Sequence, residues 1–143
     1  MKRKITEEQK KQLVQKALEA RKAAYVPYSG FRVGAALLTQ DGEVFTGCNI
    51  ENASFTPTVC AERTAVFKAV SEGHQEFAAL AVTGGKGEEP PAAVCTPCGV
   101  CRQVLREFVE PEEFPIYLGK GDGTWEEVTL EDLLPRSFGK TNL

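Results

Sequence analysis

The sequence predicts a single α/β domain of three layers, in which a mixed five-stranded sheet carries helices on both faces. Segments with helical periodicity alternate with short strand-like runs, which is the pattern of a layered α/β domain. One pair of runs meets at an Asp-Gly turn, which indicates a hairpin within the sheet. The length of 143 residues, with 42% hydrophobic and 26% charged residues, fits one globular domain over residues 1–143.

The first half of the chain predicts one helix and one hairpin. Residues 6–24 are expected to form the helix, because the Thr-Glu-Glu start resembles a capped end and apolar residues recur at helical spacing. Residues 25–30 contain proline and glycine and are expected to form a loop. Residues 31–40 and 43–50 are strand-like and flank the Asp-Gly pair at 41–42, so we expect them to pair antiparallel.

The second half predicts two more helices and three strands. One helix is expected to begin near Cys60 and to run to Gly73. Another is expected over 98–109, because Pro97 precedes it and proline is favoured at helix starts. Strands that are joined through helices are expected to be parallel neighbours. The remaining elements are strands at 77–85, 114–119 and 125–130, and a helical turn at 130–135.

The charge of the chain argues against a polynucleotide or membrane partner. The formal net charge is -3 and the basic residues are spread thinly, whereas a duplex-binding protein presents a positive face to the phosphates. No apolar run reaches the length of a membrane span. The charged start MKRKITEEQKKQ lacks the apolar centre of a secretion signal. We therefore expect a cytoplasmic protein that acts on a small molecule.

The cysteines point to a bound metal. There are five, an odd number without an export signal, so reduced thiols are expected rather than disulfides. Cys98 and Cys101 are three residues apart on a first helical turn, a spacing typical of half a tetrahedral zinc site. Cys60 is expected to add a third thiolate from the start of another helix, where partial positive charge lowers the pKa of a thiol.

Three protein ligands leave one position of a zinc ion open to water, as in catalytic sites. Glu62 lies two residues after Cys60, where it can take a proton from that water and pass it to a substrate nitrogen. Arg63 is expected to donate hydrogen bonds to thiolate sulfur and to offset the excess negative charge of three thiolates. The pattern predicts hydrolytic chemistry.

A structural or redox role of the cysteines is the alternative. A Cys-x-x-Cys pair alone is as typical of structural zinc or of a redox pair as of catalysis. Structural zinc needs a fourth ligand, for which Cys95 is the candidate, and it leaves Glu62 without a role. We interpret Cys95 instead as a small buried thiol at a strand end.

Two motifs, CAE at 60–62 and PCxxC at 97–101, resemble the signature of zinc-dependent nucleobase deaminases, in the variant with cysteine where others have histidine. The resemblance extends to the short cytidine deaminases over nearly the whole chain, in family order. The matching blocks are PYSGFRVGAAL (27–37), GCNIENASF (47–55), CAERTA (60–65), PCGVCRQVL (97–105) and LLPRSF (133–138).

This resemblance implies an enzyme of pyrimidine salvage that deaminates cytidine, and deoxycytidine as well, to uridine or deoxyuridine and ammonia. It implies one Zn²⁺ per chain on Cys60, Cys98 and Cys101, a zinc-bound hydroxide that attacks the base, and Glu62 as proton shuttle. It also implies a homotetramer. A deaminase of nucleoside antibiotics is the alternative among related enzymes, and the intact NIENAS block favours an ordinary ribose.

The same resemblance implies how the substrate is held. Asn49 and Glu51 match a polar pair that grips a ribose hydroxyl; without the match, a turn-capping role is the more common one. Phe31 matches a wall against which the pyrimidine packs, and simple core packing is its alternative. The match also implies that the backbone at Ala61 contacts the carbonyl edge of the base, that Phe138 reaches a neighbouring subunit's site, and that Phe55 stands where many relatives have tyrosine.

Overall fold

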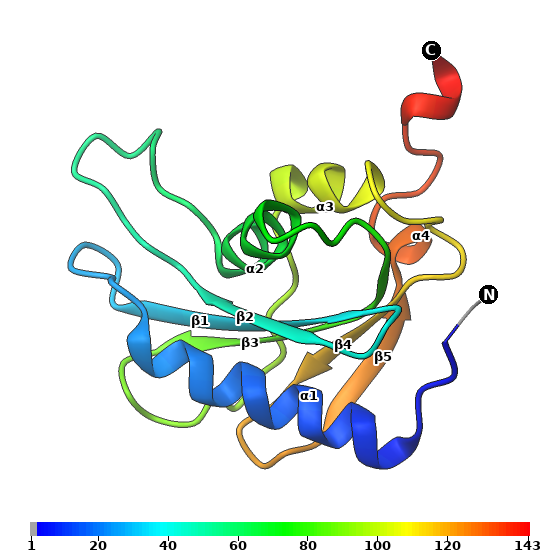
Figure 1. Ribbon diagram of the computed structural model, residues 1–143. Coiled ribbons are helices and arrows are strands. Elements are labelled where there is room, and N and C mark those ends of the chain that lie inside the picture. Colours follow the sequence, from blue (N-terminus) through cyan, green and yellow to red (C-terminus); the bar gives the residue numbers. More distant parts are fainter. Residues whose placement is uncertain (1–2) are drawn as a thin grey trace.

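A five-stranded sheet forms the middle layer of the computed structural model, which describes residues 3–143. The strands are β1 (Phe31–Thr39), β2 (Val44–Cys48), β3 (Phe77–Lys86), β4 (Pro115–Gly119) and β5 (Trp125–Thr129). The helices are α1 (Glu7–Ala20), α2 (Ala61–Ser71), α3 (Gly99–Arg106) and α4 (Leu130–Leu133), with short 3-10 turns η1 (Arg21–Ala23) and η2 (Lys140–Asn142). Helix α1 covers one face of the sheet, and α2 and α3 cover the other (Figure 1). The predicted three layers are confirmed.

The sheet is mixed, with strand order β2-β1-β3-β4-β5. The hairpin prediction is confirmed, because β1 and β2 pair antiparallel and Gly42 at their turn has a φ of +95°. Strand β3 is antiparallel to β1 and parallel to β4, and β5 is antiparallel to β4. The expectation of parallel neighbours is right for β3 and β4, which are joined through α3. It is wrong for β2 and β3, which are joined through α2 but are not neighbours. Strand β1, the hairpin partner of β2, lies between them.

Helix α1 begins at a capping box. Thr6 Oγ1 accepts a hydrogen bond from the backbone N–H of Gln9 at 3.1 Å, and the Gln9 side chain accepts one from the backbone N–H of Thr6 at 2.9 Å. Both orphan N–H groups are thereby satisfied at the helix start. The helix buries an apolar stripe against the sheet, made of Leu13, Val14 and Ala17.

Two helices are shorter than predicted. The range 6–24 is α-helical only to Ala20, and the range 98–109 only to Arg106. Beyond these points the backbone tightens into i→i−3 hydrogen bonds, such as Ala24 N–H to the Arg21 carbonyl at 3.2 Å. The apolar pattern continues through such turns, so periodicity alone places the ends too late.

Apolar side chains alternate between the two faces of β1. Ala35 and Leu37 pack in the core under α2 and α3, whereas Ala36 and Leu38 pack in the core under α1. Val33 contacts the first of these cores. By the same period of two, Phe31 at the start of the strand belongs to the α2 face of the sheet.

The helices approach the sheet most closely at two glycines. A Cβ atom at Gly34 on β1 would lie 2.0 Å from the carbonyl oxygen of Ala17 in α1. A Cβ atom at Gly47 on β2 would lie 2.5 Å from the carbonyl oxygen of Ala61 and 2.6 Å from the backbone nitrogen of Ala65, both in α2. Only glycine permits these contacts with helix backbone, and Gly47 therefore sets the position of the first turn of α2.

Replacing Gly47 with alanine is expected to lower the stability of the fold by about 3 kcal/mol, because rigid backbone must move to admit the new methyl group. Thermal unfolding of the chelator-treated protein measures the effect. Gly99→Ala is the control, since nothing lies within 4 Å of a Cβ at that position. Equal melting temperatures for the two variants would show that α2 is not held by this contact.

Candidate active site

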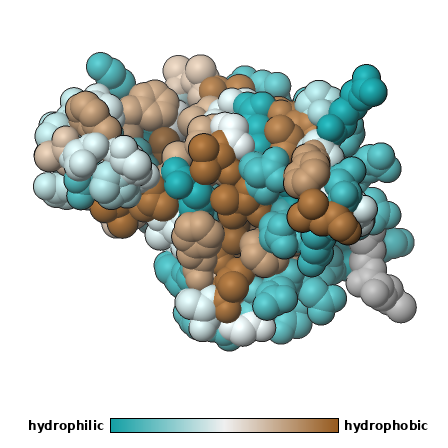
Figure 2. Space-filling model, turned by 90° about the horizontal axis from the view of Figure 1, so that it is seen from above, coloured by the Kyte–Doolittle hydropathy of each residue, from teal (hydrophilic) through white to brown (hydrophobic). Residues whose placement is uncertain are grey.

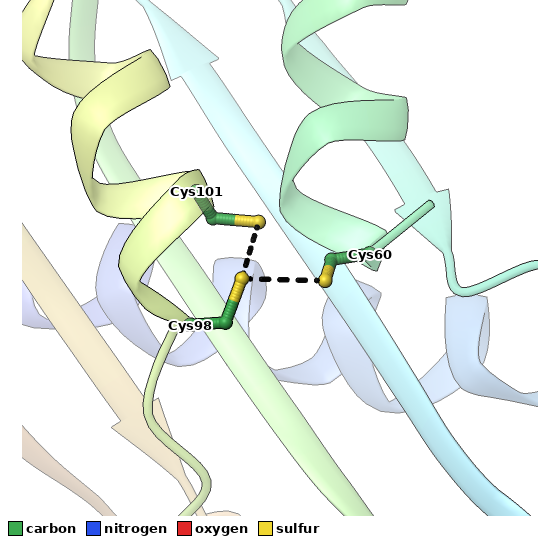
Figure 3. A group of neighbouring side chains, drawn as sticks. All are labelled: Cys60, Cys98 and Cys101. Atoms are coloured by element: carbon green, nitrogen blue, oxygen red, sulfur yellow. Dashed lines mark hydrogen bonds between the residues drawn. The ribbon is translucent and has the colours of Figure 1, made fainter. Parts of the chain in front are cut away.

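The first turns of α2 and α3 bring three cysteines together (Figure 3). Cys60 is the N-cap residue of α2, Cys98 is that of α3, and Cys101 lies in the first turn of α3. Neither N-cap side chain forms a capping hydrogen bond with its own helix. The sulfurs point towards one another from the starts of these two helices.

The three sulfurs have the spacing that a tetrahedral metal ion needs. Cys98 Sγ lies 3.5 Å from Cys60 Sγ and 3.5 Å from Cys101 Sγ, and all three atoms lie within 4.8 Å of one another. A zinc ion with Zn–S bonds of about 2.3 Å separates its sulfur ligands by about 3.8 Å. Thiolates are also the soft donors that suit zinc. Cys60, Cys98 and Cys101 can therefore hold a zinc ion, as predicted.

Cys95 stays outside this group in the part of the chain that the structure describes. Its Sγ faces the Thr96 carbonyl at 3.9 Å and packs against Gly84, where a Cβ atom would lie 2.9 Å from the sulfur. Burial, and then the charges of Glu62 and Cys60, raise the pKa of Cys95 to about 11, so the thiol remains protonated at neutral pH. The three-cysteine arrangement thus differs from a closed four-sulfur cage.

Arg63 lies beside the sulfurs. Its Nη2 donates a hydrogen bond to Cys60 Sγ at 3.4 Å. The pKa of Cys60 lies below its usual value because the Cys101 thiol, and then Arg63, hydrogen-bond to the sulfur. A guanidinium at this position offsets part of the negative charge that three thiolates place around a dication.

Glu62 is buried next to the cysteines, with 3% of its surface exposed. Its Oε1 atom has no hydrogen-bond partner among the described residues. Burial raises the pKa of Glu62 to about 7. A buried carboxyl oxygen without a hydrogen-bond partner is costly to the fold, and buried carboxyl groups with a raised pKa are characteristic of sites where protons are transferred. The arrangement suits a group that both accepts and releases a proton near neutral pH.

Phe31 lies close to Cys95, which is outside the three-cysteine cluster. A Cβ atom at Gly84 would lie 3.1 Å from Phe31 Cε1 and 2.9 Å from Cys95 Sγ, so the aromatic ring and the thiol meet over this glycine. The ring is 37% exposed, which leaves part of it available for contact. Sequence reasoning does not single out Gly84, although two consecutive glycines at the end of a strand pattern indicate a close approach.

Asn49 and Glu51 both hold the segment that leads into β1. The Asn49 amide accepts from Val33 N–H and donates to the Phe31 carbonyl, each at 2.9 Å. Glu51 Oε1 accepts from the N–H groups of Tyr28 at 3.0 Å and Ser29 at 3.1 Å, and Oε2 accepts from Ser29 Oγ. These bonds, with that of Ser29 first, lower the pKa of Glu51. The turn-stabilising role is therefore present: it places the Asn49 amide at the Phe31 backbone and the Glu51 carboxylate at Ser29, two residues before Phe31.

Ala61 and Phe138 lie in different regions. Ala61 is fully buried at the first turn of α2, between Cys60 and Glu62. Phe138 is 57% exposed on the C-terminal segment, where its carbonyl accepts a hydrogen bond from Gln103 on α3. In Figure 1 this red segment rises at the right, whereas the loop before β1 lies at the left. The segment that carries Phe138 therefore lies on the other side of the molecule from the loop that leads into β1.

A cavity of about 520 Å³ opens elsewhere, along the edge where β3 and β4 begin. Acidic and aromatic residues line it, including Glu76, Glu112, Phe77 and Phe108, and no predicted site residue does. It has neither the thiols nor the carboxyl group that the chemistry above requires. The candidate active site is therefore the cysteine cluster and its surroundings.

Comparison with known proteins agrees with this site. The family described as "Cytidine and deoxycytidylate deaminase zinc-binding region" matches residues 7–117. The cytidine deaminase of Halalkalibacterium halodurans is 50% identical over 126 residues, which cover 88% of this chain and 91% of that protein. The cytidine deaminase of Sporosarcina psychrophila is also 50% identical, over 131 residues that cover 92% of each protein.

Solved structures show the same fold. The crystal structure of cytidine deaminase from Burkholderia pseudomallei has a TM-score of 0.81 and 44% identity, covering 94% of this chain and 100% of that one. The crystal structure of cytidine deaminase from Mycobacterium tuberculosis has a TM-score of 0.74 and 44% identity, covering 90% of this chain and 95% of that one. The likeness therefore extends over most of the chain and is not limited to the cysteine motifs.

Proposed function

The chain belongs to the cytidine and deoxycytidylate deaminase family, and from this membership we propose that it hydrolyses both cytidine and deoxycytidine to the uracil nucleoside and ammonia. One observation carries the proposal: three converging cysteine sulfurs lie beside a buried carboxyl group with an unpartnered oxygen. Zinc on Cys60, Cys98 and Cys101 supplies a Lewis acid that makes water nucleophilic at neutral pH. Glu62 moves the protons.

The proton transfers that we propose are supported by the raised pKa that burial gives Glu62. Its carboxylate takes a proton from the attacking water, whose oxygen bonds to the ring carbon that carries the amine. The carboxyl group then gives that proton to the adjacent ring nitrogen. A second proton, from the hydroxyl group now on that carbon, passes through Glu62 to the amine; the carbon–oxygen double bond forms, the carbon–nitrogen bond breaks, and ammonia leaves. A pKa near 7 suits both directions of transfer.

We propose that the nucleoside lies over the start of β1. The exposed part of Phe31 supports stacking of the pyrimidine, and the buried backbone at Ala61 is next to Glu62 for contact with the carbonyl edge. Asn49 and Glu51 lie beside Phe31 and offer an amide and a carboxylate to a sugar hydroxyl. A site built around that hydroxyl discriminates against the free base, since its polar groups would be left unpaired.

Glu51→Gln is expected to raise KM for cytidine about 10- to 100-fold, the value of one hydrogen bond to a charged acceptor. Gln retains an Oε1 acceptor for Tyr28 and Ser29, so the loop is expected to stay in place. Steady-state kinetics measure the effect, and Glu88→Gln, exposed on the loop after β3, is the control. An unchanged KM would leave Glu51 with its loop-stabilising role alone.

We propose further that the active form is a homotetramer. Seen from above, the face with α2 and α3 gathers apolar side chains in its middle (Figure 2). Phe67 on α2 is 51% exposed and Val100 on α3 is 57% exposed, which is unfavourable in water but suits contact between subunits. Phe138 is distant from its own chain's Phe31 and is available to a neighbour.

Light scattering of the purified protein is expected to give four chains per particle, and a monomer at micromolar concentration would contradict this.

A cytoplasmic role in pyrimidine salvage completes the proposal. The acidic balance, with a net charge of -3, supports a small nucleoside rather than a polynucleotide as substrate. No helix among residues 3–143 is both long and apolar enough to cross a bilayer.

The proposal is tested by mixing the purified protein with cytidine or deoxycytidine and following ultraviolet absorbance. We expect conversion to the uracil nucleoside, release of ammonia in equal amount, and loss of activity after treatment with a zinc chelator. Activity should return when zinc is added. Zinc-loaded protein that leaves both nucleosides unchanged would refute the proposed function.

A further inference from the structure

The three cysteines of the metal centre are held to different degrees. Cys101 is 1% exposed and is fixed by the packing of α3. Cys60 follows Val59, which exchanges two backbone hydrogen bonds with Ile50, and its sulfur accepts a hydrogen bond from Arg63. Cys98 is exposed and ends the long loop that follows β3. Its position depends on whatever fixes the end of that loop.

Arg102 makes the contacts that fix it. Its Nε donates to the carbonyl of Pro97 at 2.7 Å, and its Nη2 lies 3.4 Å from Thr96 Oγ1. Side chains on a helix tilt towards its N-terminus, so an arginine in the first turn of α3 reaches back over this loop. Pro97 is fully buried, and a buried carbonyl without a partner would be costly.

The same guanidinium attaches the loop to a second element. Arg102 Nη1 donates to the carbonyl of Leu133, the last residue of α4, at 2.6 Å. The C-terminal end of a helix carries partial negative charge, which favours a cation there. Helix α4 is itself anchored, because Leu130 is fully buried and Thr129 and Asp132 form a capping box. The planar fork of arginine thus bridges the cysteine loop and a fixed part of the core.

We propose that Arg102 is a positioning residue of the metal centre: by holding the Pro97 carbonyl against Leu133, it keeps Cys98 at the distance from Cys60 and Cys101 that zinc binding requires. This inference rests on the proposed zinc site. Arg102 acts on the metal through the backbone of Pro97 and Cys98, in contrast to Arg63, which donates directly to a sulfur. Groups that orient metal ligands in this way commonly contribute about 10- to 100-fold to metal affinity.

The test compares the zinc affinity of the full chain with that of Arg102→Met, by competition with a chromophoric chelator. Methionine keeps much of the side-chain stem but makes none of the three hydrogen bonds. We expect an affinity about 10- to 100-fold weaker. In the cobalt-substituted protein we expect weaker or shifted thiolate-to-metal and d–d absorption bands, which report tetrahedral geometry directly. Circular dichroism of the metal-free proteins checks that the fold is retained.

Two further variants separate position from charge and from general effects on α3. Arg102→Lys keeps the positive charge but has a single point donor that cannot bridge Pro97 and Leu133, so most of the loss is expected to persist. Arg106→Met removes the other arginine of α3, which donates to Ser137, and is expected to leave zinc affinity unchanged. Should Arg102→Met fail to fold, the lysine variant decides the question by the same measurement.

The outcomes distinguish this inference from the function on which it rests. If the unmodified chain binds no zinc, the proposed function and the inference both fail. If the unmodified chain binds zinc and Arg102→Met binds it equally well, only the inference fails. Full affinity in Arg102→Lys would also overturn it, since charge rather than the bridging geometry would then be responsible. An equal loss in Arg106→Met would assign the effect to α3 as a whole and would overturn it likewise.

Discussion

Replacing Glu62 with glutamine is expected to lower kcat for cytidine by about 10³-fold or more while zinc remains bound. The glutamine amide has nearly the shape of the carboxyl group but can neither accept nor release the transferred proton, and such transfers contribute about 10²- to 10⁴-fold to rates. Zinc should remain because the sulfur ligands are untouched. Steady-state kinetics with parallel zinc analysis measures both quantities.

The stability of this variant provides a second readout. Glu62 is 3% exposed and its Oε1 has no hydrogen-bond partner among the described residues. Ionising this buried carboxyl group therefore costs free energy in the folded state. Because the pKa of Glu62 is raised in the fold, the free energy of unfolding falls as pH rises from the pKa of Glu62 in the unfolded chain to about 7. Above pH 7, metal-free Glu62→Gln should therefore melt at the same temperature as the metal-free parent chain or at a higher temperature. Glu72→Gln, at the opposite end of α2, is the control and should change neither kcat nor melting. Near-normal turnover in Glu62→Gln would remove this residue from the mechanism.

Replacing Cys101 with serine is expected to abolish both zinc binding and activity, with turnover falling more than about 10³-fold because water is no longer activated by a metal. Cys101 lies at the buried side of the cluster, where a serine hydroxyl is a harder and poorer zinc ligand than cysteine sulfur. Elemental analysis should give one zinc per parent chain and close to none for the variant. Added zinc is not expected to restore activity.

Cys95→Ser is the matched control for this experiment. Cys95 is six residues earlier and is partly buried, but its sulfur packs on Gly84 instead of joining the cluster. We expect full zinc content and substantial activity, with some loss of stability from burying a hydroxyl group. Loss of zinc from this variant would mean that the centre is a four-sulfur structural site after all.

Features that depend on local sequence could be predicted. Cys98 and Cys101 are three residues apart, so any helix starting at Pro97 brings their sulfurs to one face. Glu62 is fixed next to Cys60 by the first turn of α2 in the same way. The Asp-Gly pair likewise determines a hairpin without reference to the rest of the fold.

Features that depend on segments distant in sequence could not be predicted from the residues alone. That Cys60 joins Cys98 is predicted from their chemistry, but the geometry of their meeting follows only once the connection from β2 to β3, which passes β1, is known. The partners of Arg102 come from the loop before α3 and from the end of α4, and no spacing in the sequence links them. The close approach of Gly47 to α2 is equally invisible, because a strand glycine has several explanations.

The Glu51 carboxylate has a consequence for altering which nucleosides this pocket accepts. Glu51 receives the Ser29 hydroxyl, and that hydroxyl in turn accepts the backbone N–H of Phe31 at 3.0 Å. If Glu51 holds the sugar and Phe31 the base, as we propose, selectivity for the sugar and the position of the aromatic ring are coupled through one serine. A residue at position 51 that cannot accept hydrogen bonds from Tyr28 and Ser29, unlike glutamine, is therefore expected to displace the ring as well. Libraries that vary positions 29, 31 and 51 together should yield active variants that single-site libraries miss.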